Sequence, residues 1–209
     1  MSRSSDSELP FLQGADLSYI NELQDGGVQY TKDGNTVDPY HLIKEYGGNL
    51  VRLRLWHNPT WTNYSTLTDV TRSIRRAKQE GLNVLLDFHY SDTWTDPQQN
   101  IVPAAWRPVV KYSDLLADSV YNYTYRILTH LKNSNLLPEL VQIGNETNKS
   151  IMVADNADLE PTNFVRNTKL FNAGLQAVAD FNQNNAKSIK TILHVAMNPN
   201  DAMNWVANH

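Results

Sequence analysis

The sequence contains no cysteine, which excludes disulfide bonds, thiol catalysis and thiolate metal ligands. It has no run approaching the roughly 18 apolar residues of a membrane-spanning helix, so we expect no membrane span. Its 18 basic and 22 acidic side chains give a formal net charge of -4 without a long block of either sign. Nucleic acids attract proteins with basic patches. The sequence therefore predicts no nucleic-acid partner and favours a neutral one.

Two groups of motifs are missing as well. Neither GxxxxGK[ST] nor GxGxxG occurs, so the sequence lacks the usual loops that hold a nucleotide phosphate. There is no G-x-S-x-G turn that would present a serine nucleophile. Phosphoryl transfer and esterase chemistry thus lack their usual markers.

The length and the polarity of the chain predict one folded domain. At 209 residues the chain is long enough for one sizeable core and too short for two ordinary domains. The polar residues at its start cannot bury apolar area, which predicts a flexible leader over residues 1–8. The domain is expected to occupy residues 9–209.

Short apolar runs alternate with longer amphipathic ones along the chain. The short runs predict strands near residues 11–16, 50–56, 83–90, 140–146 and 190–197. The amphipathic runs predict helices near 39–46 after Asp38, from Thr68 or Asp69 to Gly81, from Ser113 through Leu131, and after Pro161. Because strands and helices alternate, the sheet should be parallel. The long connections at 56–68, 90–113 and 146–162 are typical of the loops that form the active site of a (β/α)₈ barrel.

Alternation within the expected strands brings polar side chains to one face of the sheet. That face carries Arg52, Arg54 and Trp56 in the second strand, Asp87 and His89 in the third, and Gln142 and Glu146 in the fourth. A buried charge is tolerated only when it is paired, so we expect Arg54 to pair with Asp87 or Glu146. A structural ion-pair cluster without catalysis would produce the same pattern.

Glu146 stands at the end of the fourth expected strand, next to the amide donor Asn145. A carboxyl group in that position suits the protonation of a glycosidic oxygen. Retaining cleavage of a glycoside takes two carboxyl groups about 5 to 5.5 Å apart, one as nucleophile and one as acid and then base. Glu146 would supply one of these two groups. The alternative is a glutamate that caps a helix or is solvated at a strand end.

Tryptophan is concentrated near the second and third expected strands and their loops. Four of the five tryptophans fall there: Trp56, Trp61, Trp94 and Trp106. Sugar rings stack their apolar C–H faces on aromatic rings, which favours a carbohydrate cleft, and we expect about half of these four to touch sugar. Trp94, between Asp92 and Asp96, is the best candidate, whereas Trp205 is expected to pack within a helix layer.

His89 and His194 fall near the ends of the third and fifth expected strands. Each could hydrogen-bond a sugar hydroxyl or the nucleophile, or be a satisfied core histidine. Asp87, His89 and Asp92 lie close enough in sequence to raise a metal-dependent barrel hydrolase as an alternative. Their spacing matches no common ligand signature, so we expect neither a metal site nor another cofactor.

Five segments of the chain form a recognisable set: GADLSYINEL at 14–23, NLVRLRLWHNP at 49–59, LLDFHYSDTWTDP at 85–97, PAAW at 103–106 and VQIGNE at 141–146. Together they resemble glycoside hydrolase family 53, the endo-β-1,4-galactanases. The resemblance implies a (β/α)₈ barrel and retaining hydrolysis of β-1,4-galactan in pectic type I arabinogalactan side chains, without a cofactor. It also implies that Glu146 is the acid/base and that Asn145 contacts the 2-hydroxyl of the sugar.

The same resemblance implies further site residues and a location. Asp16, Arg54, His89, Asp92 and Trp94 match motif positions that line the sugar subsites, Trp56 belongs to the same motifs, and His194 resembles a histidine of the fifth strand. Family members are exported, which implies an extracellular, cell-surface or periplasmic enzyme, and a monomer when full length.

Two departures from the family pattern stand out. After Glu146 the chain reads TNKSIMVADN, where family members tend to have a glycine and a tryptophan-containing loop. A barrel of this type needs about 250 residues, whereas only about the first five β/α units can be counted. The nucleophile is expected on the seventh strand, beyond residue 209. We therefore expect a portion of a longer protein, or a fragment completed by another polypeptide; a non-catalytic galactan-binding barrel fragment is the alternative.

Overall fold

The computed structural model describes residues 11–209, so the leader predicted over residues 1–8 lies outside the described residues. Its main sheet has five strands, all parallel, in the order β1-β4-β5-β6-β7. The strands are β1 (Gly14–Asp16), β4 (Leu50–Leu55), β5 (Asn83–Phe88), β6 (Leu140–Ile143) and β7 (Lys190–Ile192). Each lies inside a range that its apolar run predicted, and the predicted parallel sheet is confirmed.

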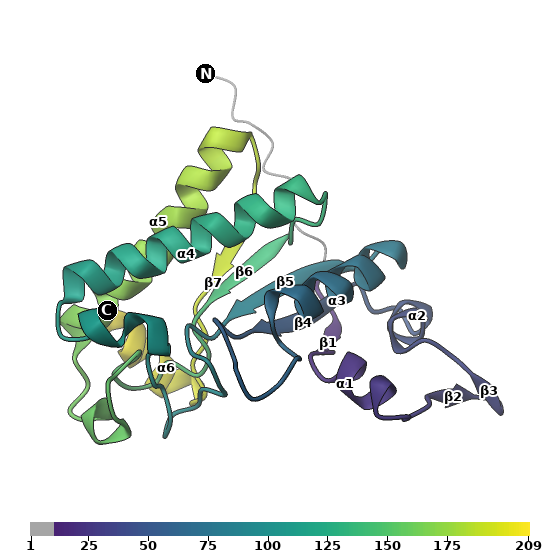
Figure 1. The fold of residues 1–209 in the computed structure, drawn as a ribbon, viewed down its shortest axis with the longest axis horizontal. Coiled ribbons are helices and arrows are strands. Elements are labelled where there is room, and N and C mark those ends of the chain that lie inside the picture. Colours follow the sequence, from purple (N-terminus) through teal and green to yellow (C-terminus); the bar gives the residue numbers. More distant parts are fainter. Residues whose placement is uncertain (1–10) are drawn as a thin grey trace.

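Helices connect the strands and cover one face of the sheet (Figure 1). They are α1 (Ile20–Asp25), α2 (Pro39–Glu45), α3 (Leu67–Gln79), α4 (Ser113–Asn133), α5 (Phe164–Asn185) and α6 (Pro199–Asn208), with 3₁₀ turns η1 (Ala104–Val109) and η2 (Asn156–Leu159). Helices α4 and α5 pack side by side, α3 packs on β4 and β5, and α5 packs on β6. A short hairpin of β2 (Thr31–Lys32) and β3 (Asn35–Thr36) precedes α2.

The N-terminal caps of α2 and α3 can be compared with the caps that the sequence predicted. Asp38 caps α2 as predicted, because its side chain accepts the backbone N–H of Tyr40 at 2.8 Å. The expected start of α3 at Thr68 or Asp69 is wrong. Thr66 is the cap, since its backbone is extended and its hydroxyl accepts the N–H of Asp69 at 3.2 Å. Asp69 in turn accepts the N–H of Ser65, the residue before the cap, at 2.8 Å.

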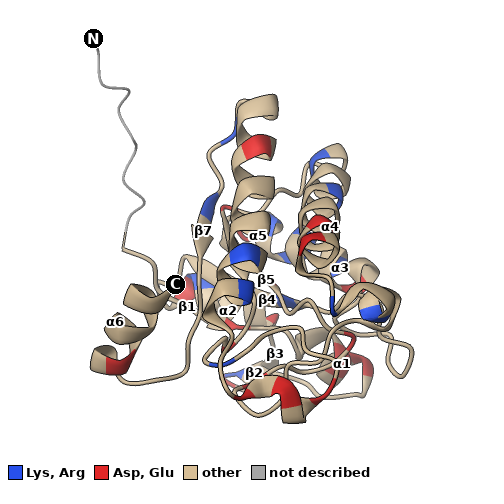
Figure 2. Cartoon of the chain, turned by 90° about the vertical axis from the view of Figure 1, so that its left-hand side faces the viewer, with Lys and Arg blue, Asp and Glu red and all other residues tan. Residues whose placement is uncertain are grey.

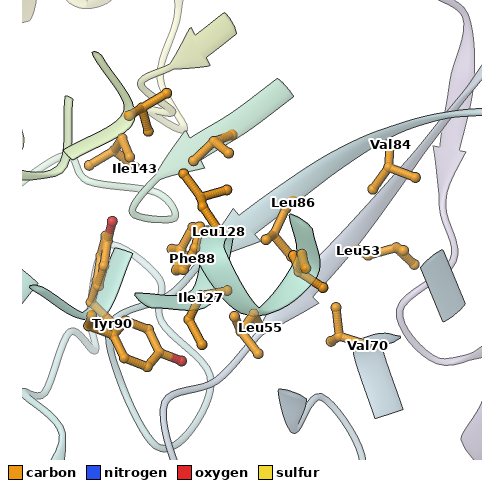
Figure 3. Close-up of a cluster of buried hydrophobic side chains, with 14 of the residues drawn as sticks. Leu53, Leu55, Val70, Val84, Leu86, Phe88, Tyr90, Ile127, Leu128 and Ile143 are labelled. Atoms are coloured by element: carbon orange, nitrogen blue, oxygen red, sulfur yellow. The ribbon is translucent and has the colours of Figure 1, made fainter. Parts of the chain in front are cut away.

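The hydrophobic core lies between the helices and the aliphatic face of the sheet (Figure 3). The strand side chains in it are Leu53, Leu55, Val84, Leu86, Phe88, Val141 and Ile143, all almost fully buried. Val70 of α3 and Ile127 and Leu128 of α4 cover them. Burying each such side chain contributes about 1.5–3 kcal/mol. The aliphatic face of the sheet thus packs against the helices, and the polar side chains of the strands lie on the opposite face.

Charge is spread over the molecule rather than gathered. Basic and acidic residues are interspersed along the helices and loops that the structure describes (Figure 2). Within residues 11–209, none of the helices combines the length and the apolar character needed to cross a lipid bilayer.

Candidate active site

Arg52 connects the polar side chains at the carboxyl ends of the strands. Its Nη2 donates to Oδ2 of Asp87 on β5 and to Oδ1 of Asn145, which follows β6, both at 2.7 Å. Its Nε donates to Oε1 of Gln142 on β6 at 3.0 Å, and Nη1 pairs with Asp16 at the end of β1. Asp87 is fully buried. One guanidinium therefore joins the ends of four strands around a shared space, as the alternation of side chains predicted.

The predicted pairing of Arg54 with Asp87 or Glu146 is wrong. Arg54 is the ladder neighbour of Asp87, but its guanidinium lies among aromatic rings, and Nε donates to Oγ of Ser65 at 3.0 Å. Arg52, two residues earlier on the same face, reaches along the strand and takes Asp87 instead. Both arginines face the polar side as expected; alternation alone does not show which of the two reaches the carboxylate.

The turn after β6 places Asn145 and Glu146. Gly144 and Glu146 have φ values of 85° and 48°, in the left-handed region. For a non-glycine residue this conformation costs on the order of 1–3 kcal/mol and is found preferentially at functional sites. The turn buries Asn145 and leaves Glu146 partly exposed. Among the contacts of residues 11–209, none engages the Glu146 carboxyl, so this group is free to meet a ligand.

The amide of Asn145 is held in one orientation. Its Oδ1 accepts from Arg52, and its Nδ2 donates to the carbonyl oxygen of Thr95 at 2.8 Å. Nδ1 of His194 lies 2.9 Å from the same Oδ1 and 3.2 Å from the backbone nitrogen of Glu146. In the tautomer protonated at Nδ1 it donates to the amide of Asn145, and in the other tautomer it accepts the N–H of Glu146. One N–H of Asn145 remains for a ligand.

His194 sits half-buried beside this amide. Burial lowers the pKa of its imidazole below its ordinary value, and the nearby Arg52 guanidinium adds to the effect. A neutral ring that donates through Nδ1 has Nε2 as a hydrogen-bond acceptor. His194 can therefore accept a hydroxyl proton from a ligand at Nε2.

His89 is buried beneath the site rather than at its surface. Its Nδ1 lies 3.0 Å from Oγ1 of Thr95, and its Nε2 lies 2.9 Å from Oδ2 of Asp87. Its side chain has no exposed area, and Trp56 and Trp94 flank the ring. These contacts favour a supporting role for His89 over direct contact with a ligand.

Two further aspartates hold their surroundings in place. Burial would raise the pKa of Asp16, but hydrogen bonds from Ser18 and the charge of Arg52 hold it below its ordinary value. The same balance applies to Asp92, where burial is outweighed by His57 and by the backbone N–H groups of Ala104 and Asn58, so that the pKa of Asp92 is lowered. Those two N–H groups lie 2.8 and 2.9 Å from its carboxylate. Asp92 thus ties two strand-to-helix loops together.

The considered metal trio does not assemble in the described part of the chain. Asp87 and His89 are adjacent, but the Asp92 carboxylate is directed to the neighbouring loops. Within residues 11–209 no cluster of three or more histidine or acidic side chains has the arrangement of a metal site.

The aromatic side chains fall into open and closed groups. Trp61 is 63% and Trp94 37% exposed, whereas Trp56 and Trp106 are buried. Trp61 rests on Trp56 with ring centroids 5.0 Å apart, and its indole N–H donates to the carbonyl of Asp92 at 3.1 Å. Trp205 is buried and packs against Phe171, which confirms the prediction that it lies within a helix layer. Two open rings therefore stand beside the polar cluster.

Sequence reasoning missed two features of this site. Arg52, rather than Arg54, is the centre of the polar cluster. Tyr19, which is 49% exposed and contacts Arg54, was not considered. Its signal was its position three residues after Asp16, at the carboxyl end of the first strand.

Comparisons with known proteins agree with this architecture. Residues 12–209 match the family model for Glycosyl hydrolase family 53. The chain is 46% identical over 197 residues to the arabinogalactan endo-beta-1,4-galactanase of Cellvibrio japonicus (strain Ueda107), covering 94% of this chain and 52% of that protein. It is 33% identical over 182 residues to the endo-beta-1,4-galactanase of Bacillus subtilis (strain 168), covering 83% and 40%. The chain thus spans about half the length of these relatives, or less.

Solved structures show the same fold. The GH53 catalytic domain of Ignisphaera aggregans matches with a TM-score of 0.81 and 32% identity, over 96% of this chain and 56% of that one. A fungal beta-1,4-galactanase structure also matches at 0.81, with 30% identity, over 96% and 58%. The predicted fold class is therefore confirmed: the five parallel strands and their helices are β/α units of a (β/α)₈ barrel.

Proposed function

Because the chain belongs to glycosyl hydrolase family 53, we propose that this protein is a retaining, endo-acting glycoside hydrolase that cleaves β-1,4-galactan, with Glu146 as its acid/base. The observation that supports this most is the free carboxyl of Glu146 beside the fixed amide of Asn145. The proposed substrate is the galactan of pectic type I arabinogalactan side chains. A polymer of this kind does not enter a cell, so we propose that the protein is exported. From its resemblance to the family we also propose that the full-length protein is a monomer.

In the proposed reaction, Glu146 first acts as an acid. It donates its proton to the glycosidic oxygen while the bond to the anomeric carbon breaks and a carboxylate nucleophile attacks that carbon. Glu146 then takes a proton from water, which releases the sugar from the enzyme with retention of configuration. The remaining N–H of Asn145 donates to the 2-hydroxyl, a contact that strengthens in the transition state.

The nucleophile is not among the acidic groups that gather at the strand ends. Within residues 11–209, Asp16 and Asp87 both pair with Arg52 at this end of the sheet, and Asp87 also contacts His89. We place the nucleophile on the seventh strand of the barrel, beyond residue 209, at about 5 to 5.5 Å from Glu146 in the working enzyme.

The other site residues have binding or supporting roles in this proposal. Trp94 offers an exposed ring to a sugar face, and His194 accepts a hydroxyl proton at Nε2. Asp16 is exposed at the edge of the polar cluster. The remaining predicted residues support these groups: Arg54, Trp56 and His89 are buried, and Asp92 is partly buried and holds the loops.

The test compares the Glu146→Gln variant with the unaltered protein on β-1,4-galactan. Hydrolysis is measured as the reducing ends released. We expect turnover to fall on the order of 10²–10⁴-fold, because the variant cannot transfer a proton, while folding and oligosaccharide binding persist. Glu160→Gln is the matched control, since that side chain is exposed and 3.8 Å from Lys149. Near-normal turnover in Glu146→Gln would remove Glu146 from the mechanism.

A second candidate is a galactan-binding barrel without hydrolysis. The exposed rings of Trp61 and Trp94 favour it because they can bind sugar. The ion pairs of Asp16 and Asp87 with Arg52 favour it as well, because neither carboxylate is then free to act as a nucleophile. Binding and reducing ends, measured separately on the unaltered protein, distinguish the two. Binding without any increase in reducing ends would establish the second candidate.

A further inference from the structure

The guanidinium of Arg54 lies at the centre of three aromatic rings. Its Cζ is 4.3 Å from the ring centroid of Trp56, 4.4 Å from that of Tyr19 and 4.9 Å from that of Trp94. The three rings come from the end of β4, the start of α1 and the loop after β5. Arg54 therefore contacts one aromatic ring from each of three segments.

The burial of Arg54 is unusual for a charge without an acidic partner. The residue is 2% exposed, and in the described part of the chain no carboxylate oxygen lies within 4.0 Å of its guanidinium. Burying a charge is costly unless something compensates it. Here the compensation is the attraction of the cation to three ring faces, which is stronger in a desolvated site, and the hydrogen bond to Ser65.

The rings around Arg54 differ in how open they are. Trp56 is 3% exposed and forms the floor, whereas Tyr19 and Trp94 are 49% and 37% exposed. Both of these rings contact the guanidinium and still keep a substantial part of their surface exposed to solvent. The guanidinium itself is covered by rings and cannot receive an anion. A ligand here meets aromatic faces, which fit the apolar C–H faces of a neutral sugar.

We propose that Arg54 is a positioning residue that holds Tyr19 and Trp94 as two platforms of one galactan-binding surface. Tyr19 thereby becomes a substrate-contacting residue, and Arg54 acts through the rings without touching sugar. This inference deepens the proposed function and rests on it. It explains why an arginine, rather than an aliphatic residue of similar volume, occupies a buried position without an acidic partner.

The test is a double-mutant cycle of Arg54→Lys and Tyr19→Ala, with KM and kcat measured on β-1,4-galactan. Lysine keeps the charge but lacks the planar group that stacks on several rings. We expect KM to rise about tenfold, equivalent to about 1.4 kcal/mol, in each single variant, with kcat within about threefold of the unaltered protein. The double variant should be no worse than the worse single variant, because both changes disable the same platform.

A purely structural role would give a different result. Arg54→Lys would then lower the melting temperature and leave KM unchanged, or its effect would add fully to that of Tyr19→Ala; either outcome overturns the proposal. Tyr19 is exposed, so Tyr19→Ala keeps the test valid even where Arg54→Lys unfolds. Arg72→Lys is the control, since Arg72 pairs with Asp25 on the surface and should keep its KM.

Oligosaccharide binding, followed by tryptophan fluorescence, separates this inference from the proposed function. If the unaltered protein binds β-1,4-galactotetraose without hydrolysing it, the hydrolase proposal fails. The double-mutant cycle is then measured by the Kd for this oligosaccharide, and Kd is expected to change as described for KM. If the unaltered protein neither binds nor hydrolyses galactan, both proposals fail. If the protein hydrolyses galactan and its KM is unchanged in the Arg54→Lys and Tyr19→Ala variants, only this inference is overturned.

Discussion

Arg52 and Arg54 are two residues apart on one strand, and their surroundings differ completely. Arg52 is partly exposed and meets the carboxylates of Asp16 and Asp87, whereas Arg54 is buried among aromatic rings. The stability of the polar cluster should therefore depend on Arg52. Removing one partner of a buried pair leaves the other charge uncompensated, which is costly.

Arg52→Met should lower the free energy of unfolding by about 3 kcal/mol or more, because the buried Asp87 loses its cation. The measurement is urea-induced unfolding at neutral pH. Arg72→Met is the matched control: its pair with Asp25 is exposed to solvent, so little loss of stability is expected. Equal losses in the two variants would contradict a special role for Arg52.

Asp92 gives the protein a predictable response to acid. A carboxyl group whose pKa is lowered by folding contributes stability above its unfolded pKa of about 3.9, and this contribution is lost as the pH falls through the folded value. The pKa of Asp92 is lowered in this way by His57 and two backbone N–H groups, against the effect of burial. Asp92→Asn should therefore cost about 1–3 kcal/mol at pH 7 and much less near pH 2.

Urea unfolding of Asp92→Asn at the two pH values checks this expectation. The control is Asp118→Asn, an exposed position on α4 where little change is expected at either pH. A difference between Asp92→Asn and the unaltered protein that persists undiminished at pH 2 would show that ionisation is not the cause.

At the scale of elements, the start of helix α3 was predicted about two residues too late, because two threonines there could each cap the helix. Thr66 and Thr68 both precede an amphipathic run and could serve as caps. The structure selects Thr66, whose hydroxyl accepts the N–H of Asp69, while Thr68 is exposed inside the first turn. Which threonine caps the helix depends on Asp69, whose carboxylate binds Ser65 and Asn21.

Thr66→Ala should destabilise the protein by about 1 kcal/mol, because the N–H of Asp69 loses its acceptor. Thr68→Ala, at an exposed helical position, should change the free energy of unfolding by less than about 0.5 kcal/mol. Thermal or urea unfolding of the pair measures the difference. A larger loss for Thr68→Ala would place the helix start where the sequence alone suggested it.

The five strands of the sheet and helices α3, α4 and α5 followed from apolar spacing, and α2 followed from Asp38 as its cap, Pro39 and the glycines after it. Helices α1 and α6 were not predicted. The hairpin of β2 and β3 has strands of two residues each, which are too short for any alternation to appear. The same limit applies to the 3₁₀ turns η1 and η2, whose positions depend on loop contacts.

Side-chain direction was predictable for the strands, but the choice of partner was not. Alternation correctly placed Arg52, Arg54 and Asp87 on one face. It did not show that Arg52 would reach Asp87, because that choice depends on the rings that surround Arg54. Likewise, the burial of His89 follows from Asp87 and Thr95, which meet it only in the folded sheet and loops.

At the scale of the whole molecule, parallel strands bring distant parts of the sequence to one edge. Arg52 meets Asn145, 93 residues later, and His194 reaches the same amide from the segment after β7. Helices cover the aliphatic face of the sheet (Figures 1 and 3). The polar groups meet one another through the hydrogen bonds of Arg52 and Asn145. A (β/α)₈ barrel places its active site at this end of its strands. We propose that Glu146, Asn145 and the open aromatic rings share one sugar-sized space there.

The most direct test is a crystal structure of the Glu146→Gln variant with bound β-1,4-galactotetraose. We predict that the side chain at position 146 lies within hydrogen-bonding distance of a glycosidic oxygen, that Asn145 contacts a 2-hydroxyl, and that sugar rings stack on Trp94 and Tyr19. A sugar chain bound elsewhere on the molecule, or a side chain at position 146 that points away from the bound sugar, would contradict the account.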